Sequence, residues 1–524
     1  MRVFGLMLLG ASAALAQPAF VPVPAGTAGA APAAAAGVQA LSATRPLAAA
    51  EFVHRVVIGN AGAQAARLQA QAAGKLVDAE RALYDPTLTG RARRLGSDRP
   101  RSVDERLSGA LIQAEAVERA DTLQAGLRGK LPSGATFELS HDSNRRASNL
   151  LQNEDTREYR GTLALTLKQP LLRGYGRAST EADLRVAERE QLVEQQRLLE
   201  QVLQLVGDAA GTWWRLHHAE QMLAIRRAGV QTALELQQEA RRRVEGGFAP
   251  RIDLLEAEFA IASRQTELAR VQQVIVEVQA RARSLLGAEG DGPAAPALGA
   301  LGAPPGWLVL DDSAEPAMPA QALERWPAWQ IARLRLEQEQ LRLDFARRQE
   351  QPDVSLELGL NRNSLTDRFK SALERSLGAA HQGWQAGVVL EMPLDNGAAR
   401  SRREAQGLRR DAARAQLEAA ARLAVSEWAT RRGQVQASRV ELEQLHRELV
   451  AREALLAAER ENHALGRSRL RQLVEAQDRV DDGRLRMAEA QMRARLADIA
   501  YLAVAGTLLE TFDVQMATRP ASSP

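Results

Sequence analysis

The histidines are the side chains of this chain best suited to metal binding or to acid–base chemistry near neutral pH. No two of them stand four residues apart with a carboxylate between them, as a zinc-binding HExxH helix requires. His217 and His218 are adjacent, so on a helix they point in different directions. We therefore expect neither a metal site nor a cofactor among the seven histidines, which are His54, His141, His217, His218, His381, His446 and His463.

Motifs for covalent or phosphoryl chemistry are also missing. The sequence has no glycine-rich phosphate loop and no nucleophile elbow. It has no cysteine for a disulfide, a thiolate metal site or a lipid-modified N-terminus. The adjacent Trp213 and Trp214 fit the core of a helical bundle better than a binding site. We therefore expect a protein that is not an enzyme.

The charges of the chain are balanced and dispersed. Its 68 basic and 65 acidic residues leave a formal charge of only +3 in 524 residues. They are interleaved along helical stretches, whereas a nucleic-acid-binding face needs clustered cations. We therefore expect no nucleic acid partner.

The N-terminus is typical of an exported protein. Residues 1–16 have a basic start, a short apolar run and the small-residue cleavage site Ala14-Leu15-Ala16, which predict a signal peptide. Residues 17–50 are rich in Ala, Pro and Gly and predict a flexible leader. No later apolar run reaches the ~18 residues of a spanning helix. Such a chain crosses a membrane only as a closed barrel.

Several segments alternate apolar and polar residues with a period of two, which predicts strands with one apolar face. In a soluble sandwich the apolar face is buried, whereas in a membrane barrel it faces lipid. Both alternatives stay open on patterning alone. The alternating segments are 121–131, 136–140, 162–168, 353–361 and 384–391, with a weaker one at 87–94.

Two very long proline-free stretches follow the strands and predict long helices. Arg177 to Gly247 spans ~105 Å as helix, and Arg400 to Gly466 spans ~99 Å. Helices of this length need partner helices. Each stretch runs into a glycine and reverses, so we expect returning helices at about 251–287 and 468–513, and shorter helices at about 51–83 and 320–350.

The two reversals are copies of one turn. RVEGGFAPRIDLLEA (Arg243 to Ala257) and ALGRSRLRQLVEA (Ala464 to Ala476) each place a Gly ten residues before an Ala. Strand hairpin, long helix, tight turn and returning helix therefore occur twice. We divide the chain into a first repeat at 51–287, a linker at 288–319, a second repeat at 320–513 and a disordered tail at 514–524.

The chain resembles the outer-membrane efflux protein family, the TolC-like outer-membrane factors of tripartite pumps and type I secretion. The resemblance rests on LTLKQPLLRGYGR (Leu165 to Arg177), on its weaker partner LEMPLDNGAAR (Leu390 to Arg400) and on the two turns. It implies a mainly α fold with a β-barrel part. A homotrimer would form a 12-stranded outer-membrane β-barrel, four strands from each chain, continued by a periplasmic α-helical barrel. The strand–helix junction positions are Gln169, Pro170, Leu171, Gly174, Pro393 and Arg400.

One departure from the family pattern is expected. The alternating segment 121–131, together with 87–94, predicts one added hairpin in the first repeat. It leaves open where the first barrel strand begins.

The resemblance also implies a periplasmic gate of acidic residues after each turn. The matching positions are Asp253 and Glu256 in the first copy and Gln472 and Glu475 in the second, with Gln472 where the family often has Asp. Three chains would bring these carboxylates into a ring that attracts cations. The alternative is that Asp253 only stabilises the first turn of a helix and Glu475 lies on a solvated face.

The resemblance further places the turns at the exposed tip, where a periplasmic adaptor would dock. The positions are Arg243, Gly246, Gly247, Arg467 and Ser468, and simple helix capping is the alternative for the glycines. The expected function is a passive export duct in the outer membrane, with an adaptor, an inner-membrane transporter and lipid as partners. An exported coiled-coil protein that spaces envelope layers is the alternative. Drug, metal and protein cargo all remain open.

Overall fold

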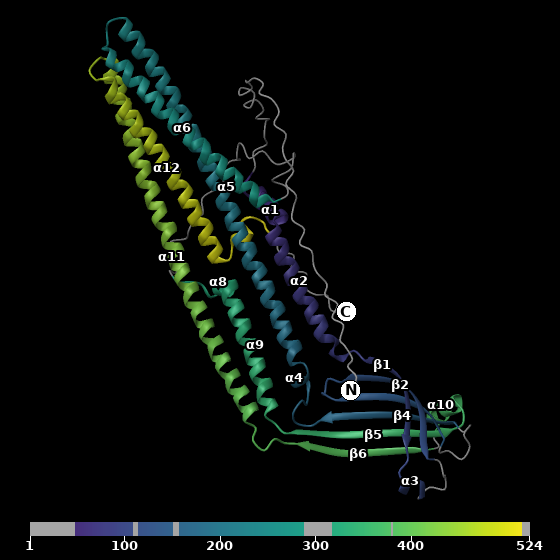
Figure 1. Ribbon diagram of the computed structural model, residues 1–524. Coiled ribbons are helices and arrows are strands. Elements are labelled where there is room, and N and C mark those ends of the chain that lie inside the picture. Colours follow the sequence, from purple (N-terminus) through teal and green to yellow (C-terminus); the bar gives the residue numbers. More distant parts are fainter. Residues whose placement is uncertain (1–47, 108–113, 150–156, 288–316, 379–380, 516–524) are drawn as a thin grey trace, which may run out of the picture. The chain divides into compact units, whose positions relative to one another are not determined.

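The computed structural model describes residues 48–107, 114–149, 157–287, 317–378 and 381–515. The expected signal peptide, almost all of the leader and most of the linker lie outside these ranges. Within them the chain consists of one antiparallel sheet and a set of helices, two of which are very long (Figure 1).

The sheet has six strands in chain order, each pairing with the next. Four strands come from the first repeat and two from the second, so the added hairpin expected in the first repeat is present. The resemblance implied four strands for each chain, and the structure corrects this number to six. The strands are β1 (Thr87–Pro100), β2 (Glu115–Lys130), β3 (Thr136–Ser148), β4 (Arg157–Pro170), β5 (Asp353–Thr366) and β6 (Gln382–Glu391).

Two short helices accompany the strands at the end far from the long helices. The helix α3 (Val103–Leu107) follows β1, and α10 (Phe369–Leu377) lies between β5 and β6. The hydroxyl of Ser364 in β5 donates to the Ala372 carbonyl of α10 (2.7 Å). The Tyr159 ring of β4 meets the Phe369 ring edge to face (6.5 Å between centroids). Thus α10 covers one face of the sheet near its outer end.

The long helices form the two expected hairpins (Figure 1). In the first repeat, α4 (Arg177–Thr180) leads into α5 (Ala182–Glu245), which pairs with α6 (Arg251–Leu286). In the second repeat, α11 (Gly397–Ala464) pairs with α12 (Leu470–Ala505). With 64 and 68 residues, α5 and α11 are ~96 and ~102 Å long. The predicted long helices are therefore confirmed.

Three shorter helices are interrupted where the sequence analysis expected continuous ones. The helix expected at 51–83 is α1 (Ala49–Gly59) and α2 (Ala61–Arg81), because Asn60 ends one and caps the other by accepting from the Gly62 amide (2.9 Å). Pro327 begins α9 (Pro327–Gln349) after the short α8 (Ala320–Glu324). Gly506, with φ +73°, ends α12 before α13 (Leu508–Thr511).

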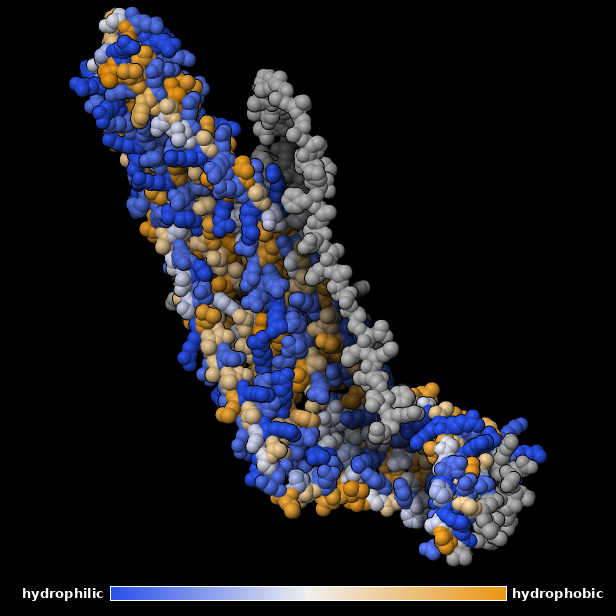
Figure 2. Space-filling model, in the orientation of Figure 1, coloured by the Kyte–Doolittle hydropathy of each residue, from blue (hydrophilic) through white to orange (hydrophobic). Residues whose placement is uncertain are grey.

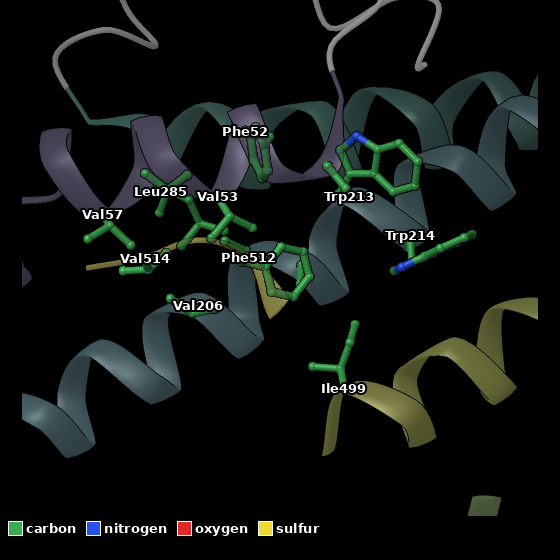
Figure 3. Close-up of a cluster of buried hydrophobic side chains, with 14 of the residues drawn as sticks. Phe52, Val53, Val57, Val206, Trp213, Trp214, Leu285, Ile499, Phe512 and Val514 are labelled. Carbon is green, nitrogen blue, oxygen red and sulfur yellow. The ribbon is translucent and has the colours of Figure 1, made fainter. Parts of the chain in front are cut away.

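The largest hydrophobic core joins both ends of the described chain to the middle of α5 and to the C-terminal parts of α6 and α12 (Figure 3). Phe52 and Val53 of α1 pack with Val206 and Trp213 of α5. Phe512, near the end of the described chain, is buried in the same cluster. Val514, which the sequence analysis assigned to a disordered tail, is buried here, so the packed fold extends past residue 513. Other members include Val57, Trp214, Leu285, Leu286, Ile499 and Leu508.

None of the described helices is long and apolar enough to cross a membrane.

Candidate functional site

The two turns expected to be copies have the same backbone geometry. Gly247 and Gly466 have φ of +73° and +72°, a conformation that other residues rarely adopt. At each turn an amide reaches back five residues: Phe248 N–H donates to the Arg243 carbonyl (2.8 Å), and Arg467 N–H to the Asn462 carbonyl (2.8 Å). This is the Schellman pattern that ends a helix. The duplicated turn is therefore confirmed.

The two turns contact each other directly. Arg243 at the end of α5 lies with Nη1 3.2 Å from Nε2 of His463 at the end of α11. The other ring nitrogen of His463 lies 3.2 Å from the Ser468 carbonyl oxygen. Leu470 of α12 packs beneath this contact against Ala240 and Ala257 of the first hairpin. The sequence pattern gave His463 no role, and the structure places it where the two turns contact each other.

Of the first pair of gate candidates, Asp253 lies at this contact. It is half-buried in the first turn of α6, which Pro250 precedes as the N-cap residue. Asp253, Arg243 and His463 line a cavity of about 10 Å³ between the hairpins. Glu256 lies one turn further along α6 and is also half-buried. The carboxylate of Asp253 thus adds a negative charge to the contact between the two turns. It also lies in the first turn of α6, where the helix macrodipole favours a carboxylate.

The second pair differs from the first in its bonding. The side chain of Gln472 accepts from the Arg469 amide (3.1 Å) and so pairs a free backbone N–H at the start of α12. Glu475 is exposed and lies between two cations, 3.0 Å from Arg471 and 3.7 Å from Arg479. Gln472 therefore has a structural role, and the charge of Glu475 is partly compensated.

The docking candidates are mostly exposed. Gly246, Gly247 and Arg467 are open to solvent, whereas Arg243 and Ser468 are half-buried. Gly246 caps α5 and Gly247 takes the positive φ, so capping accounts for both glycines. Sequence reasoning missed the apolar side chains beside them: Phe248 is 88% exposed and Leu465 is 58% exposed.

A buried arginine joins the two hairpins further along the helices. Arg264 of α6 is 7% exposed and its Nη2 lies 2.7 Å from the Asp478 carboxylate of α12. Its Nη1 donates to the Gly229 carbonyl of α5 (3.0 Å). Close by, burial raises the pKa of Asp481, which accepts from Gln477 (3.2 Å). Polar groups thus replace hydrophobic packing at this level of the bundle.

A sequence signal for these buried polar residues existed. Arg264 follows Ala257, Ala260 and Ile261 at the spacing of a buried helical stripe. Gln477 and Asp481 stand in the corresponding stripe of α12 that begins at Leu470 and Leu473. A charged residue in an apolar stripe marks a buried ion pair or a site.

The first junction motif connects β4 to the helices through tight contacts. The Gln169 side chain accepts from the Ser133 hydroxyl (2.8 Å) and donates to the Ser133 carbonyl (3.2 Å) in the β2–β3 turn. Pro170 ends β4, and Leu171 N–H donates to the Val354 carbonyl (2.7 Å). Gly174 has φ +84°, which fits the change of direction.

The second junction is simpler. Pro393 lies between the end of β6 and the start of α11. Arg400, in the first turn of α11, pairs with Asp395 (2.9 Å). Asn396 donates to the Glu350 carbonyl (2.8 Å) after α9. Both junctions thus fix a strand, a helix and the preceding segment together.

Comparison with known families identifies the second repeat. Residues 318–507 match the model of the family described as outer membrane efflux protein. The resemblance to the outer membrane efflux protein family is confirmed. The match covers both the second strand hairpin and the second helical hairpin, including the turn at Gly466. None of the curated protein sequences matches this chain significantly.

Solved structures of outer-membrane channels share the fold of most of the chain. VceC of Vibrio cholerae is 15% identical, with a TM-score of 0.61 over 87% of this chain and 96% of its own. CmeC of Campylobacter jejuni is 11% identical, with a TM-score of 0.63 over 88% and 86%. MtrE of Neisseria gonorrhoeae is 16% identical, with a TM-score of 0.61 over 89% and 91%. The chain therefore has the fold of these channels, and the cell outer membrane with a large periplasmic part is the location of such proteins.

Trp213, Trp214 and His217 pack against neighbouring side chains. Trp213 is buried in the core and stacks on His217 (5.5 Å between centroids). The Trp214 ring lies under the Arg495 guanidinium (5.0 Å). Within the described residues no group of three or more His, Asp or Glu side chains is placed to hold a metal ion.

Proposed function

We propose that the chain is the outer-membrane exit channel of an efflux pump or a type I secretion system. As a homotrimer, it would passively conduct substrates from an inner-membrane transporter and a periplasmic adaptor to the outside. Transport of this kind needs no catalysis by the duct itself, because the transporter supplies the energy. The efflux protein match of the second repeat and the channel fold support this proposal.

The observation that carries the proposal is the exposed apolar face of the sheet. Leu139, Leu165 and Leu360 pair side by side on β3, β4 and β5, and 40%, 42% and 59% of their surfaces are exposed. Hydrophobic side chains also cover β6 at the end that joins α11 (Figure 2). A soluble sandwich would bury such a face, whereas lipid covers it in a membrane barrel.

The opposite face of the same sheet is polar. Lys168 of β4 pairs with Glu357 of β5 (2.9 Å). Thr162 donates to Asn363 (3.1 Å) on the same face. This inverted alternation favours a water-filled lumen on the polar side of the sheet.

The tip formed by the two turns is the end at which an adaptor would dock. It is exposed, carries Arg467 and presents the apolar Phe248 and Leu465. Docking surfaces typically combine an apolar anchor with Arg and a polar rim. In a trimer, three copies of Asp253, Glu256 and Glu475 would surround the axis and select for cations as a gate.

Cell fractionation with one matched pair of variants tests the proposal. We expect heat-modifiable trimers in the outer membrane, and a soluble periplasmic pool would instead indicate an exported coiled-coil spacer. Leu165→Arg should prevent outer-membrane assembly, because arginine on the lipid face costs about 2–4 kcal/mol at the midplane. Thr166→Arg, one residue away on the polar face, should assemble normally. Equal assembly of both variants would reject the assignment of the faces.

A further inference from the structure

All six strands share one apolar row. Register pairs connect these residues from strand to strand without a break, so they lie at one height on one face of the sheet. The row crosses the added hairpin of β1 and β2 as well as the four other strands. Its members are Leu88, Leu127, Leu139, Leu165, Leu360 and Trp384.

A polar row above this one also extends across the added hairpin. Three rows further out, Arg94, Asp121, Arg145 and Tyr159 pair laterally across β1 to β4 on the same face. Asp121 lies 3.1 Å from Arg94 and 3.4 Å from Arg145. Charged and aromatic residues at one height mark the headgroup boundary of a membrane barrel. At this height the added hairpin therefore carries charged residues beside those of β3, while β3 and β5 become polar two rows nearer the apolar row, at His141 and Arg362.

The added hairpin is also firmly held. The strand β2 occupies the edge of β3 from the pair Glu118–Ser148 to the pair Lys130–Thr136. The β2–β3 turn packs against the first junction, where a Cβ at Gly134 would lie 2.3 Å from the Gly174 carbonyl oxygen. A neighbouring chain could reach β3 only by breaking this pairing.

Among the described residues, no strand pairs with the outer edges of β1 and β6. Every residue of β1 and nearly every residue of β6 is exposed. The strand β1 leaves the helical end of the sheet after α2, and β6 returns to that end before α11. The two edges therefore have opposite directions, as antiparallel partners require. Long unprotected edges are rare in proteins unless another strand covers them.

We propose that β6 of one copy pairs with β1 of the next, so that three six-stranded sheets close a barrel of eighteen strands. This inference rests on the homotrimer proposed above. It replaces the 12-stranded barrel that the family resemblance implies. Because barrel diameter grows roughly linearly with strand number, the opening would be about 1.5 times as wide.

The strand ends define a register for this contact. Aligning the helical ends of β1 and β6 places Leu88 of one copy opposite Leu390 of the next, both on the apolar face. Within one chain, Leu88 lies in the same row as Trp384, which is six residues from Leu390. Closing the barrel in this register therefore shifts the rows by six residues over the six strands of one copy, or by one residue per strand. With ~3.3 Å per residue and ~4.8 Å between strands, this corresponds to a strand tilt of ~35°, which lies within the range of known barrels.

Engineered cysteines test the contact in a chain that has none of its own. Leu88→Cys is combined in turn with Leu390→Cys, Val388→Cys and Ala386→Cys, and the trimers are oxidised in the membrane. The control series replaces Leu88→Cys by Leu139→Cys, a leucine of the same row on β3. Within one chain neither position reaches β6, because other strands lie between.

We expect the Leu88 series to give disulfide-linked chains, strongest with Leu390→Cys, at a level about tenfold above the Leu139 series, because cysteines more than ~7 Å apart do not bridge. Gly90→Cys, where a Cβ meets no neighbour, serves as a second β1 position if Leu88→Cys fails to assemble. Cross-linking in the Leu139 series, or in neither series of assembled outer-membrane trimers, would overturn the eighteen-stranded barrel and leave the duct intact. A wild-type chain that forms no trimer would overturn both.

Discussion

Arg264 and Asp478 connect the two helical hairpins through an ion pair of 2.7 Å between residues that lie far apart in the sequence. The arginine is buried, whereas 58% of the aspartate side chain is exposed. The guanidinium also donates a hydrogen bond to the Gly229 carbonyl. One side chain thus holds α5, α6 and α12 together at a level where the core is polar.

Removing this arginine should loosen the bundle locally. Arg264→Met keeps the length of the side chain but removes both the ion pair with Asp478 and the second hydrogen bond to the Gly229 carbonyl, which should cost about 2 kcal/mol. Amide hydrogen exchange in α6 and α12 near this level should accelerate about 30-fold. In the control Arg270→Met, the lost pair with Glu267 is exposed, and the cost should stay below about 0.5 kcal/mol. Equal acceleration in both variants would contradict the role of Arg264.

The turn glycines should be sensitive to substitution through their backbone alone. A Cβ at Gly247 or Gly466 meets no neighbour, yet both have positive φ. We therefore expect Gly247→Ala and Gly466→Ala each to cost about 1–2 kcal/mol, measured by urea unfolding of the helices. Gly407→Ala, three turns inside α11 and with open space around it, should instead stabilise by about 0.5–1 kcal/mol. Effects of the same sign at all three positions would be inconsistent with the turn geometry.

The buried Asp498 should make stability depend on pH. Burial raises its pKa to about 6, against the opposing charges of Arg495 and Arg439. The folded state therefore binds a proton that the unfolded state, with a carboxyl pKa of 3.8, releases. This contribution to stability is gained as the pH falls through about 6 and lost as it rises.

The pH effect can be isolated by one substitution. Between pH 7.5 and 5, Asp498 should add about 1.4 kcal/mol to the free energy of unfolding. Asp498→Asn should remove this dependence, and Asp482→Asn, an exposed carboxylate on the same helix, should retain it. Urea unfolding of the helices at the two pH values provides the measurement. A pH dependence that persists in Asp498→Asn would assign it to other groups.

The architecture was largely predictable because its signals are long and repeated. Proline-free stretches fixed α5 and α11, and the duplicated turn located the tips at Gly247 and Gly466. The strand β1 was weakly predicted, because Gly90 and Ala92 have little apolar surface and Arg94 interrupts the apolar face that Leu88 begins.

The site was less predictable, because its contacts join residues more than 200 positions apart. Arg243 meets His463, and Arg264 meets Asp478, only after the two hairpins pack. The capping role of Gln472 likewise depends on where α12 begins. Sequence spacing located the gate candidates but did not show that Arg471 and Arg479 compensate Glu475.

The gate candidates predict an effect on conduction. Asp253→Asn combined with Glu475→Gln should raise single-channel conductance and relieve block by divalent cations, because fewer carboxylates would surround the axis. The larger share should come from Asp253, because Glu475 is already paired with two arginines. Glu443→Gln, on the solvated side of α11 and paired with Arg447, should leave both quantities unchanged. If the double variant behaves like this control, these residues are not part of the gate.

The central claim is that the assembled chain is a passive conduit. The most direct test is the current through purified wild-type trimers in planar lipid bilayers, without any partner protein or nucleotide. We expect discrete conductance steps of one size for each inserted trimer, reduced by magnesium added on the side of the helical tips. Inserted trimers that produce no steps would contradict it.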